Sequence, residues 1–537
     1  MHWADVAASR LAERGKSHII AAGITPSGEF HIGHIREILT GEIITRACHH
    51  IGLDAEFIFI VDSADPLRKV YPFLDDSYAD FIGHQIGSIP PPDKDGRPDI
   101  DVFERDGKTY AQHFLDPFLD ALAQIGVKPR IVDNLTMYRS GMFEPYAKMV
   151  CEAPEIIREI IERVSGRELP DDWFPWTPLD TEGRLGGVKI VDYQHPLVHF
   201  EQKNGLRGTS DISKGEGKLP WRIDWPARWC FNNITMEPFG KDHGTAGGSY
   251  DTGRELVEFF GHSAPEALTY EWISLKGKGA MSSSVGNTIG PMEALRLVPP
   301  EILRLLIAKS KPSKAIEFDS GMGLVTLADE FERLSSRDFV QELENESLSR
   351  RQRVQVEDAQ AAMRYAAVEQ GLQSTSQSVS FRHLSMVAQI RSSDEEVFQS
   401  LIDSNMIDSI TPTLIDRLSR MRYWISTHHF PEEMKIQVQS NLHQQFLEHY
   451  QPEHGLIYVA MSDQLRAIEW STDTIQSTFK EIAQQTGVAM KEIYRACYLL
   501  VLGVQKGPRI GPILEAMGQQ AALQLLELAI QHGTTKN

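Results

Sequence analysis

The sequence predicts an α/β protein, in which a parallel-sheet domain is split by an insertion and followed by all-α C-terminal domains. Two observations lead to this fold class. Strand-like apolar runs and helix-like amphipathic runs alternate from residue 18 to residue 135, which is the pattern of βαβ units. After Pro300 the pattern becomes helical almost throughout, with few strand signals.

The elements of the sheet domain follow in order. Apolar runs predict strands at 18–24, 55–66 and 130–135, and amphipathic runs predict helices at 31–52 and 108–126. The stretch 89–107 is rich in proline and aspartate and predicts a loop. Short β-like pieces and turn residues between 171 and 218 predict a small insertion, after which the α/β pattern returns at 221–229, 234–243 and 270–275. The polar stretch 369–380 predicts a linker between helical regions.

The composition of the chain limits the classes of protein to which it can belong. The chain has 537 residues, of which 41% are apolar, and no apolar run approaches the ~18–20 residues of a membrane helix. The N-terminus lacks the features of a signal peptide. The four cysteines lie far apart, which favours a reducing compartment and predicts a cytoplasmic protein. The net charge of -20 weighs against nucleic-acid binding, although a local basic patch is enough to bind phosphate.

The stretch "GITPSGEFHIGHIRE" (residues 23–37) carries the first chemical signal. An apolar strand leads through a glycine-containing loop into a helix whose N-terminus offers backbone N–H groups and a positive dipole end to phosphate. His31 and His34 share one helical face there and can donate hydrogen bonds to phosphate oxygens. The plainer alternative is a strand-to-helix turn with two incidental histidines. No Walker-type phosphate loop occurs in the sequence.

"HIGH" resembles the first signature of class I aminoacyl-tRNA synthetases, and "MSSS" with Gly286 and Asn287 resembles their second signature, KMSKS. A closer resemblance, over nearly the whole chain and in order, is to the class I lysyl-tRNA synthetases. The segments that carry it are "HWADV", "GITPSGEFHIGHIRE", "DPLRKVYPFL", "MYRSGMF", "VSGRELPDDW", "GKLPWRIDWPARW", "EPFGKDHGTAGGSYDTG", "YEWISLKGKGAMSSSVGN" and "KEIYRACYLLVLGVQKGPRIGPILEAMG".

The resemblance implies a Rossmann-like catalytic domain and helical domains that hold tRNA(Lys). Its expected parts are the first half of the catalytic domain at 1–90, an insertion at 91–215, the second half at 216–300, a helical stem-contact domain at 301–380 and a helical anticodon-binding domain at 381–537. The implied reaction joins L-lysine to tRNA(Lys) through lysyl-adenylate, using ATP accompanied by Mg²⁺.

The resemblance also implies site residues. Catalysis is assigned to His31, His34 and Lys278, ATP binding to Pro26, Gly33, Met281, Ser282, Ser283 and Ser284, and substrate binding to Gly23, Thr25, Asp62, Asp65, Asp224, Trp225, Asp242 and His243. A buried lysine ammonium needs acidic acceptors, and aromatic rings suit an alkyl-ammonium group. For Asp62, Asp65 and Asp224, capping or a structural salt bridge is an equal alternative. For one of Trp221 and Trp225, core packing is favoured.

Two departures from the family pattern matter. The insertion contains none of the cysteine pairs that relatives often carry, so we expect no structural zinc. The lysines of KMSKS are replaced by Ala280 and Ser283, with Val285 after the third serine, and we hypothesise that Lys278 supplies the missing positive charge.

Other functions stay open at this point. One is a synthetase-like paralogue with altered or lost aminoacylation, which the missing lysines favour. Another is a small-molecule nucleotidyltransferase, which would not need so much helical structure after the sheet domain. A third is an RNA-binding protein without catalysis. Residues proposed to contact RNA are Arg495, Lys506, Arg509, Tyr423, Trp424 and Tyr450, with a solvated face or core packing as the more frequent alternative.

Overall fold

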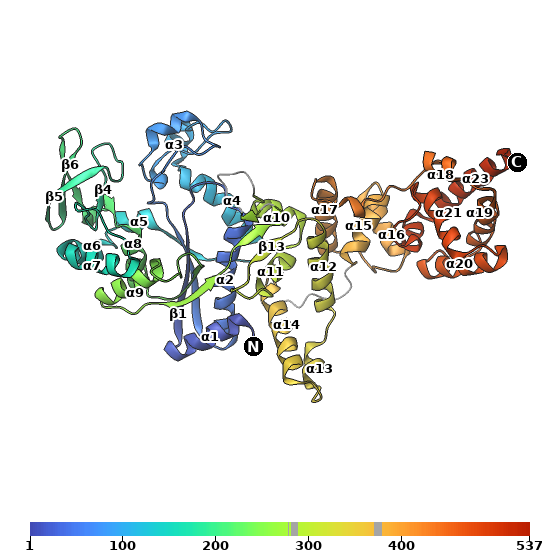
Figure 1. Cartoon of the computed structure of the whole chain (residues 1–537), viewed down its shortest axis with the longest axis horizontal. Coiled ribbons are helices and arrows are strands. Elements are labelled where there is room, and N and C mark those ends of the chain that lie inside the picture. The colour runs from blue at the N-terminus through green and yellow to red at the C-terminus, as the bar shows by residue number, and fades with distance from the viewer. Residues whose placement is uncertain (278, 281–287, 370–378, 537) are drawn as a thin grey trace. The chain divides into compact units, whose positions relative to one another are not determined.

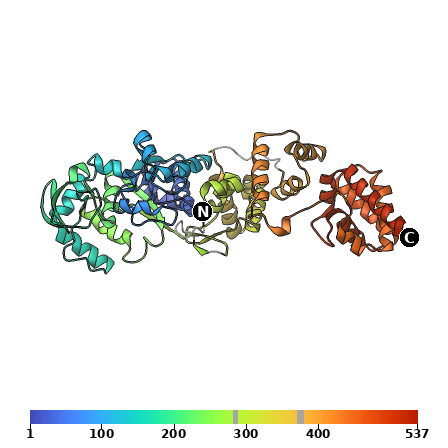
Figure 2. The same cartoon turned by 90° about the horizontal axis from the view of Figure 1, so that it is seen from above.

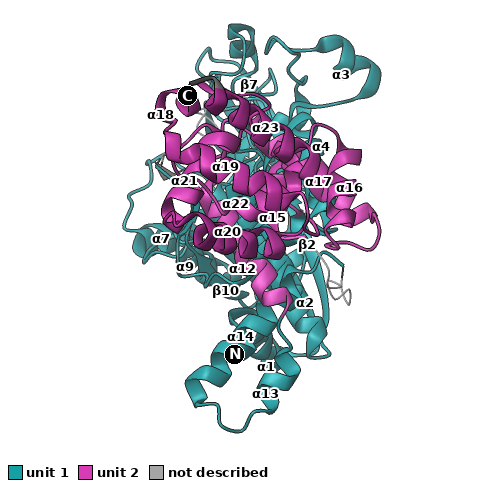
Figure 3. Ribbon diagram, turned by 90° about the vertical axis from the view of Figure 1, so that its right-hand side faces the viewer, with its two compact units in different colours: residues 1–295, 300–319, 337–373 teal, residues 296–299, 320–336, 374–537 magenta. Residues whose placement is uncertain are grey.

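The protein is described by a computed structural model over residues 1–277, 279–280, 288–369 and 379–536 (Figure 1). Its residues divide into two units (Figure 3). Unit 1 comprises residues 1–295, 300–319 and 337–373, and unit 2 comprises residues 296–299, 320–336 and 374–537. The active-site features all belong to unit 1.

The centre of unit 1 is a five-stranded sheet of strand order β10-β9-β1-β2-β3. Its strands are β1 Ser17–Ile24, β2 Asp54–Val61, β3 Arg130–Asp133, β9 Ile234–Gly240 and β10 Glu266–Tyr270. All neighbours pair in parallel, and β1 pairs with β2 in register from Ser17↔Asp54 to Ile24↔Val61. The predicted α/β class and parallel sheet are therefore confirmed. The chain winds outward from β1 to β3 and then returns to β9 on the other side of β1, so that the order reverses between β1 and β9.

Helices cover both faces of this sheet. The helices of unit 1 are α1 Trp3–Arg14, α2 Ile32–His50, α3 Ile100–Asp106, α4 Tyr110–Gln124, α5 Asn134–Arg139, α6 Glu144–Glu152, α7 Pro154–Ser165, α8 Trp221–Phe231, α9 Ser249–Phe259, α11 Pro300–Ala308, α13 Phe339–Glu344 and α14 Arg350–Ala366, with 3-10 turns η1 Asp76–Phe81, η2 Ile86–Ser88 and η3 Ile212–Lys214. Ile58 and Ile60 point into a core shared with α5 to α9, whereas Phe57 and Phe59 point to the opposite face, towards α2 and α4. Gly41 allows α2 to lie close to the sheet, because a Cβ there would stand 2.5 Å from the Phe57 ring.

The segment 91–215 does more than form an insertion. It contains a three-stranded antiparallel sheet of β5 Val188–Gln194, β6 Leu197–Gln202 and β7 Arg207–Asp211, and β4 Thr177–Pro178 pairs with β8 Gly217–Lys218. However, β3 lies in the same segment and pairs with β2 in the main sheet. The loop expected at 89–107 contains α3, which is capped by Asp99 and ends at Gly107, so that part of the prediction is wrong. The proline and aspartate signal reflects only the residues before α3.

A small sheet follows β10. It has the order β12-β11-β13, with β11 Ile273–Leu275, β12 Gly279–Ala280 and β13 Ile316–Phe318. β11 and β12 pair in an antiparallel manner, with Ser274 opposite Ala280, around a turn that contains Gly277 at φ 72°. This hairpin leads into the serine-rich stretch, whose residues 281–287 are outside the described part of the chain.

Unit 2 is built from helices, coloured yellow to red in Figures 1 and 2. They are α12 Met322–Ser335, α15 Phe381–Ile390, α16 Asp394–Asp403, α17 Pro412–Ser426, α18 Gln444–His449, α19 Pro452–Leu465, α20 Thr472–Thr486, α21 Met490–Leu502, α22 Ile510–Met517 and α23 Gln519–Lys536, with the 3-10 turn η5 Glu432–Met434; α10 Pro291–Leu297 spans the boundary between the units. The prediction of helical C-terminal domains is confirmed. Trp424 is fully buried and donates to the Ser320 carbonyl, so it belongs to the core of this unit. None of the helices described has the length and apolar character needed to cross a membrane.

Candidate active site

A cavity of about 370 Å³ opens at the carboxyl ends of β1, β9 and β10. This is the place where the strand order reverses, and ligands of open α/β sheets bind at such a point. The cavity is lined by Gly23, His31, Gly33, His34, Arg36, Glu37, Trp221, Trp225, Arg228, Glu237, Phe239, Gly240, Asp242, His243, Tyr270, Trp272 and Ile273. Seven of the residues predicted from the sequence are therefore brought together here: Gly23, His31, Gly33, His34, Trp225, Asp242 and His243.

The two histidines of "HIGH" cap the helix that they begin. His31 Nδ1 accepts a hydrogen bond from Gly33 N–H at 3.1 Å, and His34 Nδ1 accepts one from His31 N–H at 3.0 Å. Because each Nδ1 is an acceptor, the proton of each neutral ring lies on Nε2. Burial lowers the pKa of His31 to about 4 and that of His34 to about 3, so both rings are neutral donors at pH 7.

The expected free backbone N–H groups at this helix start are engaged. Ile32 N–H donates to the Ile289 carbonyl at 3.0 Å, and the next two amides are bonded to His31. That part of the prediction is wrong, since the histidines themselves complete the cap. A phosphate at this site would meet the imidazole Nε2–H groups before it met the backbone.

Sequence reasoning missed two glutamates that line the cavity, half-buried Glu37 and buried Glu237. Glu37 accepts hydrogen bonds from Gly23 N–H at 3.2 Å and from the Tyr270 hydroxyl at 2.9 Å, and burial raises its pKa to about 8. Glu237 accepts from the indole N–H groups of Trp225 at 2.9 Å and Trp229 at 2.6 Å, and burial raises its pKa as well. The hydrogen bonds that hold both carboxylates thus come from neutral donors.

A signal for each glutamate exists in the sequence. Glu37 follows His34 by three residues, so the two share a face of α2. Glu237 is the one charged residue of the apolar strand "ITMEPFG". A charge inside a buried strand is unusual enough to mark a site.

Aromatic rings form the wall between these groups. Trp221 stacks on Trp225 with ring centroids 5.3 Å apart and an interplanar angle of 16°, and the His243 ring lies 5.5 Å from that of Trp225. Trp225 is buried, whereas Trp272 is 49% exposed and carries Lys241 Nζ 5.2 Å from its ring centroid. The cavity therefore offers flat apolar surface at its base and at its mouth.

Three of the four predicted aspartates do not line this cavity. Asp62 and Asp224 both bind the guanidinium of Arg228, and Asp65 binds Lys218, in a network that is almost wholly buried. Of this network, Arg228 lines the cavity, with its guanidinium 5.2 Å from the Trp221 ring centroid. The structure thus corrects their placement: these carboxylates are engaged with cations of the protein beneath the site, which corresponds to the salt-bridge alternative. Buried charges need such partners.

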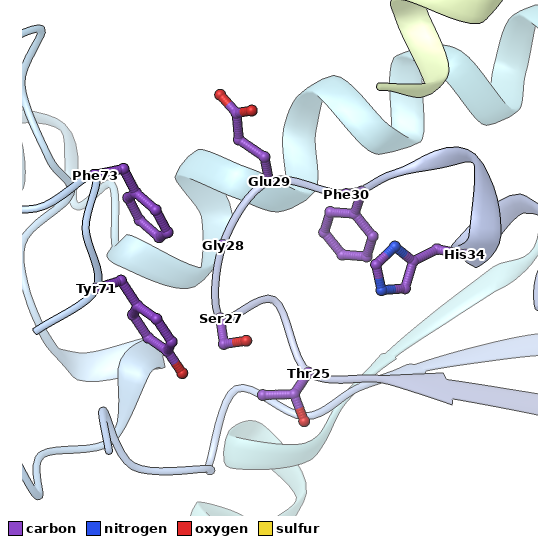
Figure 4. A pocket seen from close by; sticks show the side chains of 8 residues that line it. All are labelled: Thr25, Ser27, Gly28, Glu29, Phe30, His34, Tyr71 and Phe73. Carbon is purple, nitrogen blue, oxygen red and sulfur yellow. The ribbon is translucent and has the colours of Figure 1, made fainter. Parts of the chain in front are cut away.

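The remaining predicted residues are placed as follows. Thr25 donates to Asp65 at 3.1 Å and lines a second, smaller cavity (Figure 4). Pro26 is buried in the loop before α2. Lys278, Met281, Ser282, Ser283 and Ser284 are outside the described residues. In unit 2, Arg495 pairs with Glu492 at 3.6 Å, while Lys506 and Arg509 are exposed.

The parallel sheet, and the histidine pair that starts the helix after its first strand, agree with the class I tRNA synthetase pattern that the sequence resembles. The sequence of residues 1–360 matches the family described as "tRNA synthetases class I (K)", and residues 384–530 match "Anticodon binding domain". The chain belongs to this family of class I tRNA synthetases.

Named relatives are similar along the whole chain. The lysine–tRNA ligase of Thermoplasma volcanium is 34% identical over 97% of both chains. That of Archaeoglobus fulgidus is 34% identical over 99% of this chain and 100% of its own. A solved glutamate tRNA ligase from Elizabethkingia meningosepticum aligns with 96% of this chain and 99% of its own, at 13% identity and a TM-score of 0.48, a likeness too distant to bear on function.

Proposed function

We propose that the protein joins L-lysine to tRNA(Lys) in two steps, the first of which consumes ATP, in the cytoplasm. One observation carries the choice of amino acid: the main cavity presents two carboxyl groups, those of half-buried Glu37 and buried Glu237, bonded to neutral donors and flanked by indole rings. The lysine–tRNA ligases that resemble the chain over nearly its full length support the same assignment.

The ammonium group of lysine fits this environment. Burial raises the pKa of both glutamates because no water remains to solvate their charge. An ammonium group bound between them would supply the opposite charge and restore their ionised form. The rings of Trp221, Trp225 and His243 would cover the butyl chain, which is apolar. A neutral amino acid of the same length would leave the carboxyl groups unpaired.

The reacting groups would meet beside the histidine pair. A carboxylate oxygen of lysine attacks the α-phosphorus of ATP, a C–O–P bond forms, and the bond to the β-phosphate oxygen breaks to release pyrophosphate. Neutral His31 and His34 donate Nε2–H bonds to phosphate oxygens, and their Nδ1 bonds to the helix hold the rings in position. The 3′-terminal ribose hydroxyl of tRNA then attacks the lysyl carbonyl carbon, and AMP leaves. Neither step needs a covalent protein nucleophile, since positioning and charge stabilisation are sufficient.

Mg²⁺ belongs to the nucleotide in this proposal. No group of three or more His, Cys, Asp or Glu side chains that could hold a metal occurs among the residues described. Mg²⁺ commonly binds through substrate phosphates and water with few protein ligands, so the site is compatible with an ion carried by ATP. Bound there, the ion would neutralise charge on the phosphates.

We further propose that Lys278 supplies the charge that the degenerate KMSKS stretch lacks. It lies two residues before Ala280, between Gly277 and Gly279. Lys278→Ala is expected to slow lysine-dependent pyrophosphate exchange, because a cation near the leaving pyrophosphate stabilises the transition state. An exchange rate equal to that of the wild type would remove Lys278 from the mechanism.

One experiment tests the function as a whole. Amino-acid-dependent ATP–pyrophosphate exchange is measured for all twenty amino acids, with and without tRNA, followed by charging of tRNA. We expect exchange with lysine alone among the twenty and transfer to tRNA(Lys). Exchange with a different amino acid, or adenylation without transfer, would instead identify a paralogue of altered function, the alternative favoured by Ala280, Ser283 and Val285.

A further inference from the structure

A second, smaller cavity adjoins the main one. It has a volume of about 60 Å³ and is lined by Thr25, Ser27, Gly28, Glu29, Phe30, His34, Tyr71 and Phe73 (Figure 4). His34 lines both cavities, so the small one opens beside the phosphate-binding histidines. The side chains proposed above to hold lysine, Glu37, Glu237, Trp221, Trp225 and His243, all line the main cavity. The aromatic rim of the small cavity has no part in that proposal.

The rim carries two parallel aromatic rings. Tyr71 and Phe73 have ring centroids 5.5 Å apart and an interplanar angle of 1°, and both rings point towards the loop at Ser27 and Gly28 (Figure 4). Phe114 on α4 supports Phe73 edge-on at 5.6 Å, and Phe73 is nonetheless 36% exposed. Gly28 is needed for this packing, because a Cβ there would approach Phe73 Cζ to 3.0 Å. The result is a fixed apolar surface that is partly open to solvent.

The segment that presents these rings is anchored at both ends. Before it, Asp65 binds buried Lys218 and accepts from Thr25 at 3.1 Å, and Leu67 is buried. After it, Leu74 is buried as well. The side chains between these anchors are held at the mouth of the cavity. This arrangement favours a binding surface over a flexible linker.

Basic side chains flank the rings. Arg68 is 74% exposed and pairs with Asp65 at 3.6 Å, and Lys69 is exposed, with its Nζ lying 5.5 Å from the centroid of the Tyr71 ring. The sequence thus places two adjacent cations at the rim of the cavity. Glu29, an acidic residue of the lining, points away from the two rings in Figure 4. Aromatic rings interleaved with Arg and Lys are the surface that single-stranded nucleic acid recognises, through base stacking and phosphate contacts.

We propose that Arg68, Lys69, Tyr71 and Phe73, here called the 68–73 platform, bind the single-stranded 3′ end of the tRNA. The last nucleobase stacks on the Phe73 and Tyr71 rings, and Arg68 and Lys69 contact the phosphates. The small cavity, with room for only about two water-sized groups, receives a hydroxyl and not a base. The terminal ribose then lies next to His34, at the junction of the two cavities, where lysyl-adenylate would present its carbonyl group. This inference rests on the proposed function and names the surface that serves its second step.

The test separates the two steps of the reaction in the full-length protein. Phe73→Leu and Tyr71→Leu keep an apolar side chain but remove the ring, and Tyr71→Phe is the matched control that keeps it. For each leucine variant we expect lysine-dependent pyrophosphate exchange, measured at saturating tRNA, within about twofold of wild type, because the residues proposed to bind lysine and ATP are unchanged. We expect kcat/KM for tRNA to fall roughly 5- to 150-fold, the range for one lost base–aromatic stack. The control keeps both activities.

A binding comparison isolates the last nucleotide. Intact tRNA and tRNA that lacks its 3′-terminal nucleotide compete for the protein, with the thermal unfolding midpoint as a check on folding. The wild type should prefer intact tRNA, and Phe73→Leu should bind both alike. A raised KM for ATP in the exchange reaction would show that the rings serve the adenine of ATP and would overturn the proposal, as would unchanged tRNA kinetics. If the wild type shows no lysine-dependent exchange, the proposed function is refuted instead. The binding comparison then still tests whether the 68–73 platform binds the 3′ end of the tRNA.

Discussion

Replacing Glu37 by glutamine tests the lysine site most directly. The substitution preserves the size of the side chain and its ability to accept from Gly23 N–H, but it removes the charge that would face the ammonium group. Tyr270 keeps a polar partner, since its hydroxyl can bond an amide as well as a carboxylate. The variant therefore differs from the wild type mainly in one unit of charge.

The magnitude follows from the burial of the carboxyl group. Removing one partner of a buried ion pair costs about 3–5 kcal/mol. At pH 7 about 1.4 kcal/mol of this is offset, because the wild type must first release a proton from a carboxyl group whose pKa is about 8. The remaining loss, about 1.6–3.6 kcal/mol, corresponds to a roughly 15- to 450-fold rise in the KM for lysine.

The assay is lysine-dependent pyrophosphate exchange at a series of pH values. In the wild type the KM for lysine should fall as the pH rises from 6 to 8 and then level, because the ligand stays an ammonium ion up to a pH of about 10 while Glu37 becomes ionised. In Glu37→Gln the KM should be high and should vary less with pH over this range, because Glu237 is then the one carboxyl group left in the proposed lysine site. Glu56→Gln, at the exposed amino end of β2, is the control and should leave the KM unchanged. A change of less than threefold in Glu37→Gln, or an unaltered pH profile, would refute the lysine site proposed here.

Three further predictions concern other groups. Because the folded-state pKa of Glu37 is raised, the wild type should lose stability as the pH rises from about 4.5 to about 8, and thermal unfolding should show a smaller loss in Glu37→Gln over that interval. His34→Gln should lower the exchange rate about 100-fold at saturating lysine, and the wild-type rate should show no histidine titration between pH 6 and 8, since the pKa of His34 is about 3; a pKa near 6.5 in the rate profile would contradict this. Arg228→Met should cost about 3–5 kcal/mol in denaturant unfolding, because it leaves buried carboxylates without their cation. Arg163→Met, which removes an exposed pair with Glu255, should cost less than about 1 kcal/mol, and equal losses in the two variants would exclude a structural role for the buried network.

The sheet and the histidine turn are predictable from sequence because their signals are local. The apolar run before Thr25 and the glycine-containing loop after it dictate a strand, a turn and a helix start, and the structure has β1 and α2 at those places. The helices near the C-terminus follow from periodicity in the same way. That periodicity does not show where each helix ends: α22 and α23 are divided at Gly518, whose φ is 88°.

The proposed lysine site is less predictable because it depends on which carboxylates find a cation inside the protein. Asp62 and Asp65 end a buried strand, as acidic ligands of a substrate would, and nothing nearby in sequence shows that Arg228 and Lys218 return to bind them. For Glu37, the spacing from His34 places it on the histidine face of α2. Its raised pKa arises from tertiary packing against Tyr270, far away in sequence, so the helix pattern does not predict that shift.

In the proposed reaction, the histidine cap of α2 joins folding and catalysis in the same two side chains. Each ring uses its Nδ1 to hold the first turn of the helix, and we propose that its Nε2 binds the nucleotide. Asparagine or serine can cap a helix but reaches less far, and lysine reaches a phosphate but accepts no hydrogen bond from the backbone. A side chain that replaces His31 or His34 must both accept a backbone hydrogen bond at the helix start and reach the phosphate. In a descendant of this chain that no longer charged tRNA, substitutions at these two positions would still be disfavoured. The reason would be the stability of the central helix and not any reaction.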